Sequence, residues 1–200
     1  MFFNNLFPTA VAKFELGRDL SEVEREHLFN LETRPNHGNT TSVDNNVLNK
    51  PELQSLTEFL NNSLQEYFNT VYAPKTDANL CITQSWVNYT KTGQYHHKHD
   101  HPNSLISGVF YIQAAKESDK LHFFKDGFQQ LKIVPKDFNV YNSDSWWLEA
   151  ATGTLYLFPS SLTHMVEQVK SEDTRISLSF NTFPKGTIGG DLGLTSLNLS

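Results

Sequence analysis

Apolar residues recur every three or four positions between residues 51 and 71. A spacing of three or four places side chains on one face of an α-helix. Pro51 suits the first turn of a helix, because a backbone N–H at that position needs no partner within the helix. The pattern therefore predicts a helix over about 51–71 whose apolar face belongs to the core. That face consists of Leu53, Leu56, Leu60, Leu64, Tyr67 and Val71.

A second helix is predicted nearer the start of the chain. Ser21 and Glu24 have the Ser-x-x-Glu spacing of a capping box, in which each side chain satisfies a backbone amide of the first turn. Apolar residues follow at helical spacing, so we expect a helix over about 21–31. Residues 34–50 are rich in Asn, Thr, Gly and Ser, which favours a loop.

After Pro74 the period of the apolar residues changes from about 3.6 to 2. Short runs rich in β-branched and aromatic residues alternate with clusters of Gly, Pro, Asn and Asp, a pattern typical of an antiparallel sandwich or barrel. These runs cover residues 84–89, 104–112, 121–125, 131–134, 154–158 and 175–183. We expect one domain over 1–200, with mostly helical support in 1–80, a β core in 81–184 and a tail, 185–200, that is either a flexible strap or an edge strand.

Composition narrows the class of protein. Hydrophobic residues make up 38% and aromatic residues 12% of the chain, enough for a packed core. The net charge of −6 gives no overall basic field, which disfavours binding to duplex nucleic acid. The apolar runs are far shorter than the ~18 residues of a membrane span, and no basic, apolar leader opens the chain. We therefore expect a soluble cytoplasmic protein that has no membrane partner.

Four of the eight histidines lie between positions 96 and 101. If this segment is a regular strand, His97, His99 and His101 point to one face, while His96, Lys98 and Asp100 point to the other. Two ligands at i and i+2 on a strand can share a metal ion with a third ligand from elsewhere. His164, which follows a later strand, could be that third ligand. The lone Cys81 has no second thiol with which to build a thiolate site.

A second polar cluster lies on the last predicted strand. Alternation over 175–181 sends Arg175, Ser177, Ser179 and Asn181 to one face and Ile176, Leu178 and Phe180 to the other. A guanidinium forms a bidentate charged pair with a carboxylate, and a nearby hydroxyl can add a hydrogen bond. The polar face of this strand therefore predicts a site for a carboxylate ligand.

Four motifs, in this order and spacing, resemble the 2-oxoglutarate- and Fe(II)-dependent oxygenase superfamily. They are Ser-Trp-Val-Asn at 85–88, His-Asp-His-Pro-Asn-Ser at 99–104 with Ser-Gly-Val-Phe-Tyr at 107–111, Phe-Pro-Ser-Ser-Leu-Thr-His at 158–164, and Arg-Ile-Ser-Leu-Ser-Phe-Asn at 175–181. More narrowly, they resemble a group of oxygenases from bacteria and bacteriophages with a His-x-His-Pro element. The resemblance implies a mainly β protein with N-terminal helices, whose core is a double-stranded β-helix (a cupin-like jelly roll). A phage-infected bacterium is then one possible cellular setting.

The resemblance also implies roles for particular residues. The iron ligands are His99, His101 and His164, and Arg175 with Ser177 binds the distal carboxylate of 2-oxoglutarate. Asn88 and Tyr111 are weaker candidates for the co-substrate site, and the alternative for each is a structural role in the sheet. The common pattern of the superfamily has a carboxylate where this chain has His101, so His97 and Asp100 remain alternatives for the second ligand.

The implied activity is that of a dioxygenase, most often a hydroxylase. It uses Fe(II), 2-oxoglutarate and dioxygen, and ascorbate is expected to stimulate it. The primary substrate stays open among a protein side chain, a metabolite and a nucleobase. Two alternatives also stay open: a cupin-like metalloenzyme that does not use 2-oxoglutarate, and a non-catalytic jelly-roll protein, for instance a structural part of a phage. Trp146 and Trp147 are expected to pack a loop against the barrel rather than line a substrate entrance.

Overall fold

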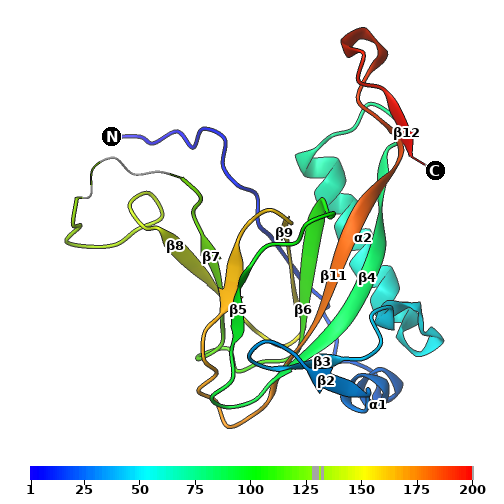
Figure 1. The fold of residues 1–200 in the computed structure, drawn as a ribbon, viewed down its shortest axis with the longest axis vertical. Helices are drawn as coiled ribbons and strands as arrows, with labels where there is room; N and C mark the ends of the chain where they lie inside the picture. The colour runs from blue at the N-terminus through cyan, green and yellow to red at the C-terminus, as the bar shows by residue number, and fades with distance from the viewer. Residues whose placement is uncertain (128–130, 132, 200) are drawn as a thin grey trace.

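Two antiparallel sheets and two main helices make up the structure, a computed structural model that describes residues 1–127, 131 and 133–199 (Figure 1). The larger sheet has the strand order β1-β9-β6-β11-β4-β3-β2, and β12 pairs with β11. The smaller sheet has the order β5-β10-β7-β8. The expected double-stranded β-helix is therefore confirmed: two antiparallel sheets lie face to face, with helices outside them.

The bounds of the strands follow the chain. Those of the larger sheet are β1 (Ala12–Glu15), β2 (Thr33–Pro35), β3 (Thr40–Ser42), β4 (Asn79–Thr90), β6 (Ile106–Gln113), β9 (Thr154–Pro159), β11 (Arg175–Ile188) and β12 (Leu197–Leu199). Those of the smaller sheet are β5 (His96–His99), β7 (Lys120–Phe124), β8 (Ser145–Glu149) and β10 (His164–Val166). The short 3-10 helices are η1 (Val47–Asn49), η2 (Pro51–Leu53) and η3 (Asp191–Gly193).

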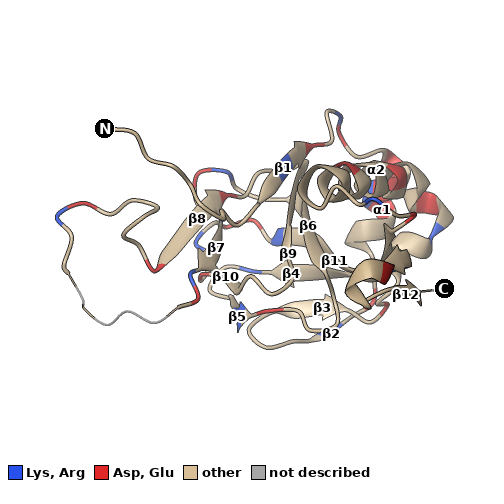
Figure 2. Ribbon diagram, turned by 90° about the horizontal axis from the view of Figure 1, so that it is seen from above, with Lys and Arg blue, Asp and Glu red and all other residues tan. Residues whose placement is uncertain are grey.

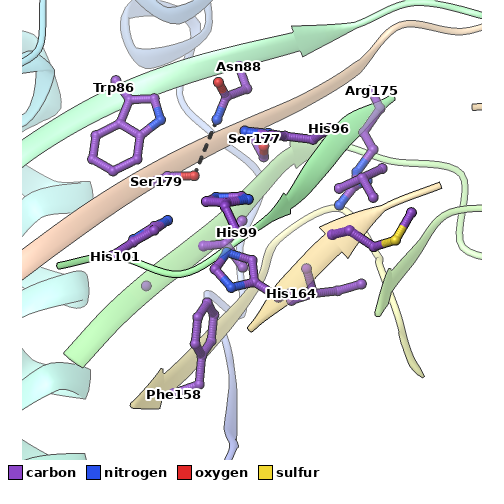
Figure 3. Close-up of a pocket in the computed structure, with 15 residues that line it drawn as sticks. Trp86, Asn88, His96, His99, His101, Phe158, His164, Arg175, Ser177 and Ser179 are labelled. Carbon is purple, nitrogen blue, oxygen red and sulfur yellow. Dashed lines mark hydrogen bonds between the residues drawn. The ribbon is translucent and has the colours of Figure 1, made fainter. Parts of the chain in front are cut away.

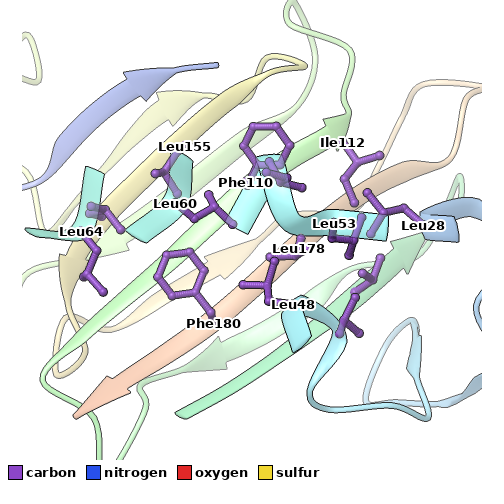
Figure 4. Close-up of a cluster of buried hydrophobic side chains, with 14 of the residues drawn as sticks. Leu28, Leu48, Leu53, Leu60, Leu64, Phe110, Ile112, Leu155, Leu178 and Phe180 are labelled. Carbon is purple, nitrogen blue, oxygen red and sulfur yellow. The ribbon is translucent and has the colours of Figure 1, made fainter. Parts of the chain in front are cut away.

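Helix α2 (Gln54–Val71) covers the outer face of the larger sheet (Figure 4). It follows η2, which begins at Pro51, so the helical segment predicted over 51–71 is confirmed. Leu56, Leu60 and Leu64 on the buried face have no exposed surface. Burying a leucine side chain contributes roughly 1.5–3 kcal/mol, so this stripe fixes α2 against the sheet.

Strand β11 separates this core from the space between the sheets. Ile176, Leu178 and Phe180 belong to the cluster packed against α2. Arg175, Ser177 and Ser179 line a pocket on the opposite face. The alternation predicted for this strand is confirmed, and one backbone segment therefore serves both a packed core and a polar cavity.

The N-terminal part contains more strand than the sequence indicated. Helix α1 (Glu22–Phe29) has the predicted capping box: Glu24 N donates to Ser21 Oγ, and Ser21 N donates to the Glu24 carboxylate. However, β1, β2 and β3 also lie within the first 80 residues. The loop predicted over 34–50 is wrong in part, because β2 and β3 form a hairpin there that pairs with β4.

One predicted strand is wrong. Leu131, Ile133 and Val134 are outside any strand and more than 80% exposed, and residue 132 lies outside the described residues. Their β-forming composition is overridden because no strand among the described residues pairs with them.

Charged residues are rare on the inner strands of the larger sheet (Figure 2). Strands β4, β6 and β9 contain no Asp, Glu, Lys or Arg, whereas β11 contains Arg175 and Lys185. Arg175 is 2% exposed. Among the described residues, no helix has the length and apolar character needed to cross a membrane.

Candidate metal and co-substrate site

Three histidines meet between the sheets, and we call them the inner triad: His99, His101 and His164 (Figure 3). His99 on β5 lies directly opposite His164 on β10, with ring centroids 4.4 Å apart. His101 follows β5, and its ring lies 5.0 Å from each of the other two. One nitrogen from each ring lies within 4.8 Å of the others, close enough for all three to bind one metal ion. The three histidines predicted from the sequence are thus brought together.

Backbone carbonyls fix the tautomer of two of these rings. His99 Nδ1 lies 2.7 Å from the His97 carbonyl oxygen, and His164 Nδ1 lies 2.9 Å from that of Leu162. A carbonyl can only accept a hydrogen bond, so Nδ1 of each ring must carry the proton. Nε2 is then left with its lone pair, as a metal ligand requires.

His101 is oriented by side chains instead. Its Nδ1 donates to Asn181 Oδ1 at 2.6 Å, and Ser107 Oγ, 2.8 Å from the same nitrogen, donates to that amide oxygen at 3.0 Å. Trp86 on β4 contacts the same ring, with centroids 5.8 Å apart. These contacts hold Nε2 of His101 toward the pocket as the third potential ligand.

Burial keeps the imidazoles neutral. It lowers the pKa of His164 to about 3 and that of His99 to about 4. Burial also lowers the pKa of His101, against the opposing effect of its hydrogen bond to Asn181. A metal binds the deprotonated ring, so the site is chemically ready for a cation at neutral pH.

Arg175 is the second half of the site. Its Nη2 donates to the hydroxyl oxygen of Tyr111 at 2.9 Å, while Nε and Nη1 are buried without a partner among the described residues. Burial raises the pKa of Tyr111, so the phenol keeps its proton and remains a hydrogen-bond donor. A buried guanidinium with two unpartnered nitrogens is costly unless an anion pairs with it. The donor set therefore fits a carboxylate-bearing ligand.

Two of the other predicted co-substrate residues, Asn88 and Ser177, line the same pocket together with Ser179, the inner triad and Arg175. Tyr111, the third, is fully buried and reaches the pocket only through its contact with Arg175. Asn88 Nδ2 donates to Ser179 Oγ at 3.4 Å, but Asn88 Oδ1 is buried without a partner in the described part of the chain. The sequence had not assigned Trp86 to the pocket, although it lies two residues from Asn88 on the same strand face, whereas Ser179 lies on the polar face of β11 as predicted.

A β-bulge corrects the predicted alternation of the histidine segment. On β10, His164 and Val166 are two residues apart, whereas their partners on β5, His99 and His96, are three apart. The additional residue on β5 turns His96 into the pocket, where the sequence had placed it on the outer face. His97, expected beside His99 and His101, does not line the pocket. It stacks instead on His37, with centroids 4.7 Å apart.

Other expectations for this region have mixed outcomes. Lys98 is exposed as predicted, and its ammonium lies 3.9 Å from the ring centroid of Phe124. Asp100 is exposed and belongs to neither histidine cluster, so the geometry does not favour it as a ligand. Trp146 and Trp147, expected to pack a loop against the barrel, lie on the edge strand β8 and are 42% and 40% exposed. Lys120 Nζ lies 3.7 Å from the Trp147 ring centroid.

A cluster of three neutral imidazoles and a buried arginine between the two sheets of a double-stranded β-helix define the class: a non-heme metalloenzyme site with a place for an anionic ligand. Comparison with known proteins names the family. Residues 84–181 match the family described as "Putative 2OG-Fe(II) oxygenase", and this segment contains the inner triad, Arg175, Asn88 and Tyr111. This part of the chain is therefore similar to the 2OG-Fe(II) oxygenases, a family of oxidoreductases dependent on Fe(II) and 2-oxoglutarate.

Solved structures share the fold at low sequence identity. A 2OG-Fe(II) oxygenase family oxidoreductase from Burkholderia pseudomallei is 15% identical with a TM-score of 0.59, over 86% of this chain and 83% of that one. HygX from Streptomyces hygroscopicus, with nickel, 2-oxoglutarate and hygromycin B bound, is 13% identical with a TM-score of 0.58, over 87% of this chain and 82% of that one. A Pseudomonas putida prolyl-4-hydroxylase is 13% identical with a TM-score of 0.56, over 86% of this chain and 92% of that one. No curated protein matches the chain.

Proposed function

We propose that the chain is a hydroxylase in which the inner triad holds Fe(II) and Arg175 binds the distal carboxylate of 2-oxoglutarate. When bound, iron and the oxo acid would supply the oxidising power for hydroxylation by dioxygen, with succinate and CO2 as the products of 2-oxoglutarate. The residues of the chain contribute geometry. The three imidazoles would hold the metal ion, and Arg175, which lines the same pocket, would bind the distal carboxylate of the oxo acid.

The observation that carries this proposal is the unsatisfied guanidinium of Arg175. It lies 2% exposed in the wall of the pocket that also contains the inner triad. Two of its nitrogens lack partners within the described residues, so their N–H groups are available to an anionic ligand such as a carboxylate. Neither a cupin-like metalloenzyme that uses no oxo acid nor a structural jelly roll needs such a group.

Three further side chains would complete the co-substrate site. Tyr111 positions Arg175 through its hydroxyl and can donate its own proton to the same carboxylate. Ser177, two residues from Arg175 on the pocket face of β11, can add a further hydroxyl donor. Asn88 is cross-strand neighbour to Ser177, and its amide lies at the pocket wall, where it can bond the oxo acid or the substrate.

The comparisons support hydroxylation without naming the primary substrate. One structural neighbour is a prolyl-4-hydroxylase, and HygX holds nickel with 2-oxoglutarate. A protein side chain and a small metabolite therefore both remain candidate substrates, with a nucleobase as the third.

Anaerobic titration tests the assignment directly. Fe(II) and 2-oxoglutarate, added together to the metal-free protein, are expected to produce a visible charge-transfer band, because a chelated oxo acid interacts electronically with the metal. His99→Ala and His164→Ala should each abolish stoichiometric Fe(II) binding, whereas His27→Ala on α1 should bind iron like the wild type. Wild-type iron affinity in His164→Ala would refute the inner triad, and a wild type that binds no 2-oxoglutarate would refute the proposed function.

A further inference from the structure

Six of the eight histidines form one continuous group of ring contacts. Neighbouring ring centroids lie between 4.4 and 5.2 Å apart along this group. It runs from an exposed ring on the β2–β3 hairpin, through β5, to the buried ring on β10. The members are His37, His96, His97, His99, His101 and His164. The proposed iron site uses three of them, which leaves three clustered imidazoles unexplained.

Three of these histidines form a second cluster with the geometry of a metal site. We call His96, His97 and His99 the outer triad, because one ring nitrogen from each lies within 4.8 Å of the others. His97 Nδ1 is buried and has no partner among the described residues. An unpaired buried nitrogen of this kind is unfavourable unless something binds it. The outer triad therefore has both the spacing and the free ring nitrogens that a metal ion needs as ligands.

The backbone around the outer triad is built to hold it. The bulge in β5 sends His96 and His99 toward the same side, with their rings stacked at 4.6 Å and 12°. The hairpin residue Gly38 accepts a hydrogen bond from Tyr95 N at 3.1 Å. Its φ of +96° and the 2.6 Å that would separate a Cβ from Tyr95 O restrict this position to glycine. This close approach places His37 against His97.

We propose that the outer triad is a second divalent-cation site, suited to Zn²⁺, that inhibits the enzyme by taking His99 away from the inner triad. Imidazole nitrogens are good ligands for Zn²⁺, which often binds three histidines and a water. His37, an exposed residue, stacks on His97 at 4.7 Å and covers the outer side of this site. No carboxylate lies in the cluster, so the donor set does not favour Mg²⁺ or Ca²⁺.

Competition follows from the ring nitrogens of His99. Its Nδ1 donates to the His97 carbonyl at 2.7 Å, which leaves Nε2 as its free nitrogen. A cation in the outer triad either takes Nε2 itself or displaces the Nδ1 proton and breaks the hydrogen bond that orients the ring. In both cases the inner triad loses a correctly placed ligand. This inhibitory effect rests on the proposed iron site, whereas zinc binding to the outer triad does not.

The test separates the two sites by mutation. In metal-free His164→Ala the inner triad is destroyed and the outer triad is intact, so this variant should bind one equivalent of Co²⁺, with visible d–d bands, and Zn²⁺ should displace it. The double variant His164→Ala/His97→Phe should lose this binding. Circular dichroism checks folding, and His101→Ala with the same second change serves if His164→Ala is misfolded. Absence of cobalt binding to a folded single variant, or binding that survives His97→Phe, would overturn the proposal.

Inhibition is measured on the iron complex. Zinc should bleach the band of wild type with Fe(II) and 2-oxoglutarate. His97→Phe should keep the band and need about tenfold more zinc to lose it, a difference of roughly 1.4 kcal/mol in zinc binding. Equal zinc sensitivity would mean that zinc enters the inner triad alone, which overturns the inhibitory role. A wild type without the band, beside cobalt binding by His164→Ala, would instead refute the proposed iron site and leave the outer triad standing.

Discussion

Arg175 donates from Nη2 to the hydroxyl of Tyr111 at 2.9 Å, and its guanidinium carbon lies 5.0 Å from the centroid of the Tyr111 ring. The two residues lie on adjacent strands, β11 and β6, with Tyr111 paired to Ser177 in the register. Tyrosine therefore satisfies one nitrogen of the guanidinium and leaves the other two directed to a ligand. Loss of Arg175 should therefore weaken 2-oxoglutarate binding more than loss of the Tyr111 hydroxyl.

We expect Arg175→Gln to weaken 2-oxoglutarate binding roughly a hundredfold to a few thousandfold, since removing one partner of a buried charged pair costs about 3–5 kcal/mol. Arg175→Lys should recover part of this loss, because an ammonium lacks the planar fork. Tyr111→Phe removes a single hydrogen bond worth about 1 kcal/mol and should weaken binding only about fivefold. Anaerobic titration gives the dissociation constants. Fe(II) binding should be unchanged throughout, and unweakened 2-oxoglutarate binding by Arg175→Gln would contradict the proposed carboxylate site.

The His101→Asp variant is expected to bind Fe(II) still and to bind 2-oxoglutarate more weakly than the wild type. Replacing a neutral ligand by a carboxylate lowers the charge of the metal site by one, and one unit charge at about 4 Å is worth about 1–4 kcal/mol, depending on the dielectric. His101→Ala provides the contrast, since it removes the ligand and should weaken the binding of Fe(II) itself. Loss of iron from His101→Asp at neutral pH would show that His101 is not the second ligand.

Acid should destabilise the metal-free protein in the range where free histidine titrates. Burial lowers the folded-state pKa of His96 to about 2, of His164 to about 3 and of His99 to about 4, whereas the unfolded values lie near 6.5. Below pH 6.5 the unfolded state then binds more protons than the folded state. The free energy of unfolding therefore decreases as the pH is lowered, by up to about 1.4 kcal/mol per pH unit for each group. Urea unfolding at pH 7.5 and pH 5 measures the difference.

The matched variant for this pH effect is His96→Gln, which removes one of these three titrating groups. The free energy of unfolding of this variant should change less between pH 7.5 and pH 5 than that of the wild type. A metal-free wild type equally stable at both pH values would contradict the burial of these rings.

Gly108→Ala should lower the free energy of unfolding by about 1–3 kcal/mol, the usual cost of overpacking a core. A Cβ at this position of β6 would overlap the ring of Phe180 on β11, which has no exposed surface. Gly190→Ala is the control, because a Cβ there meets nothing within 4 Å. Chemical denaturation of both variants checks the expectation, and equal stabilities would contradict it.

The sequence predicts the regular elements of the site well. Helix α2 and strand β11 follow their periods of 3.6 and 2, so the buried leucines and the positions of Arg175 and Ser177 could be assigned from spacing alone. These elements are regular because a core fixes one face of each. The inner triad was assigned through resemblance to a family, and the alternation expected along residues 96–101, which puts His99 and His101 on one face, supported it.

The histidine segment shows where such reasoning ends. Whether His96 or His97 faces the pocket depends on the bulge opposite β10, which is a property of strand pairing rather than of the local sequence. The contact of His37 with His97 depends on the β2–β3 hairpin, whose residues read locally as a loop. Neither arrangement has a signal within a window of ten residues.

The two faces of β11 constrain how this chain can diverge. An insertion of one residue between Arg175 and Leu178 would put the two parts of the strand out of phase, so that either Leu178 and Phe180 would enter the pocket or the arginine would point at α2. The first outcome removes core packing, and the second removes the guanidinium from the pocket. Descendants of this sequence can therefore vary this strand by substitution but not by length, whereas insertions and deletions can accumulate beyond Ile188, where the chain has left the pocket.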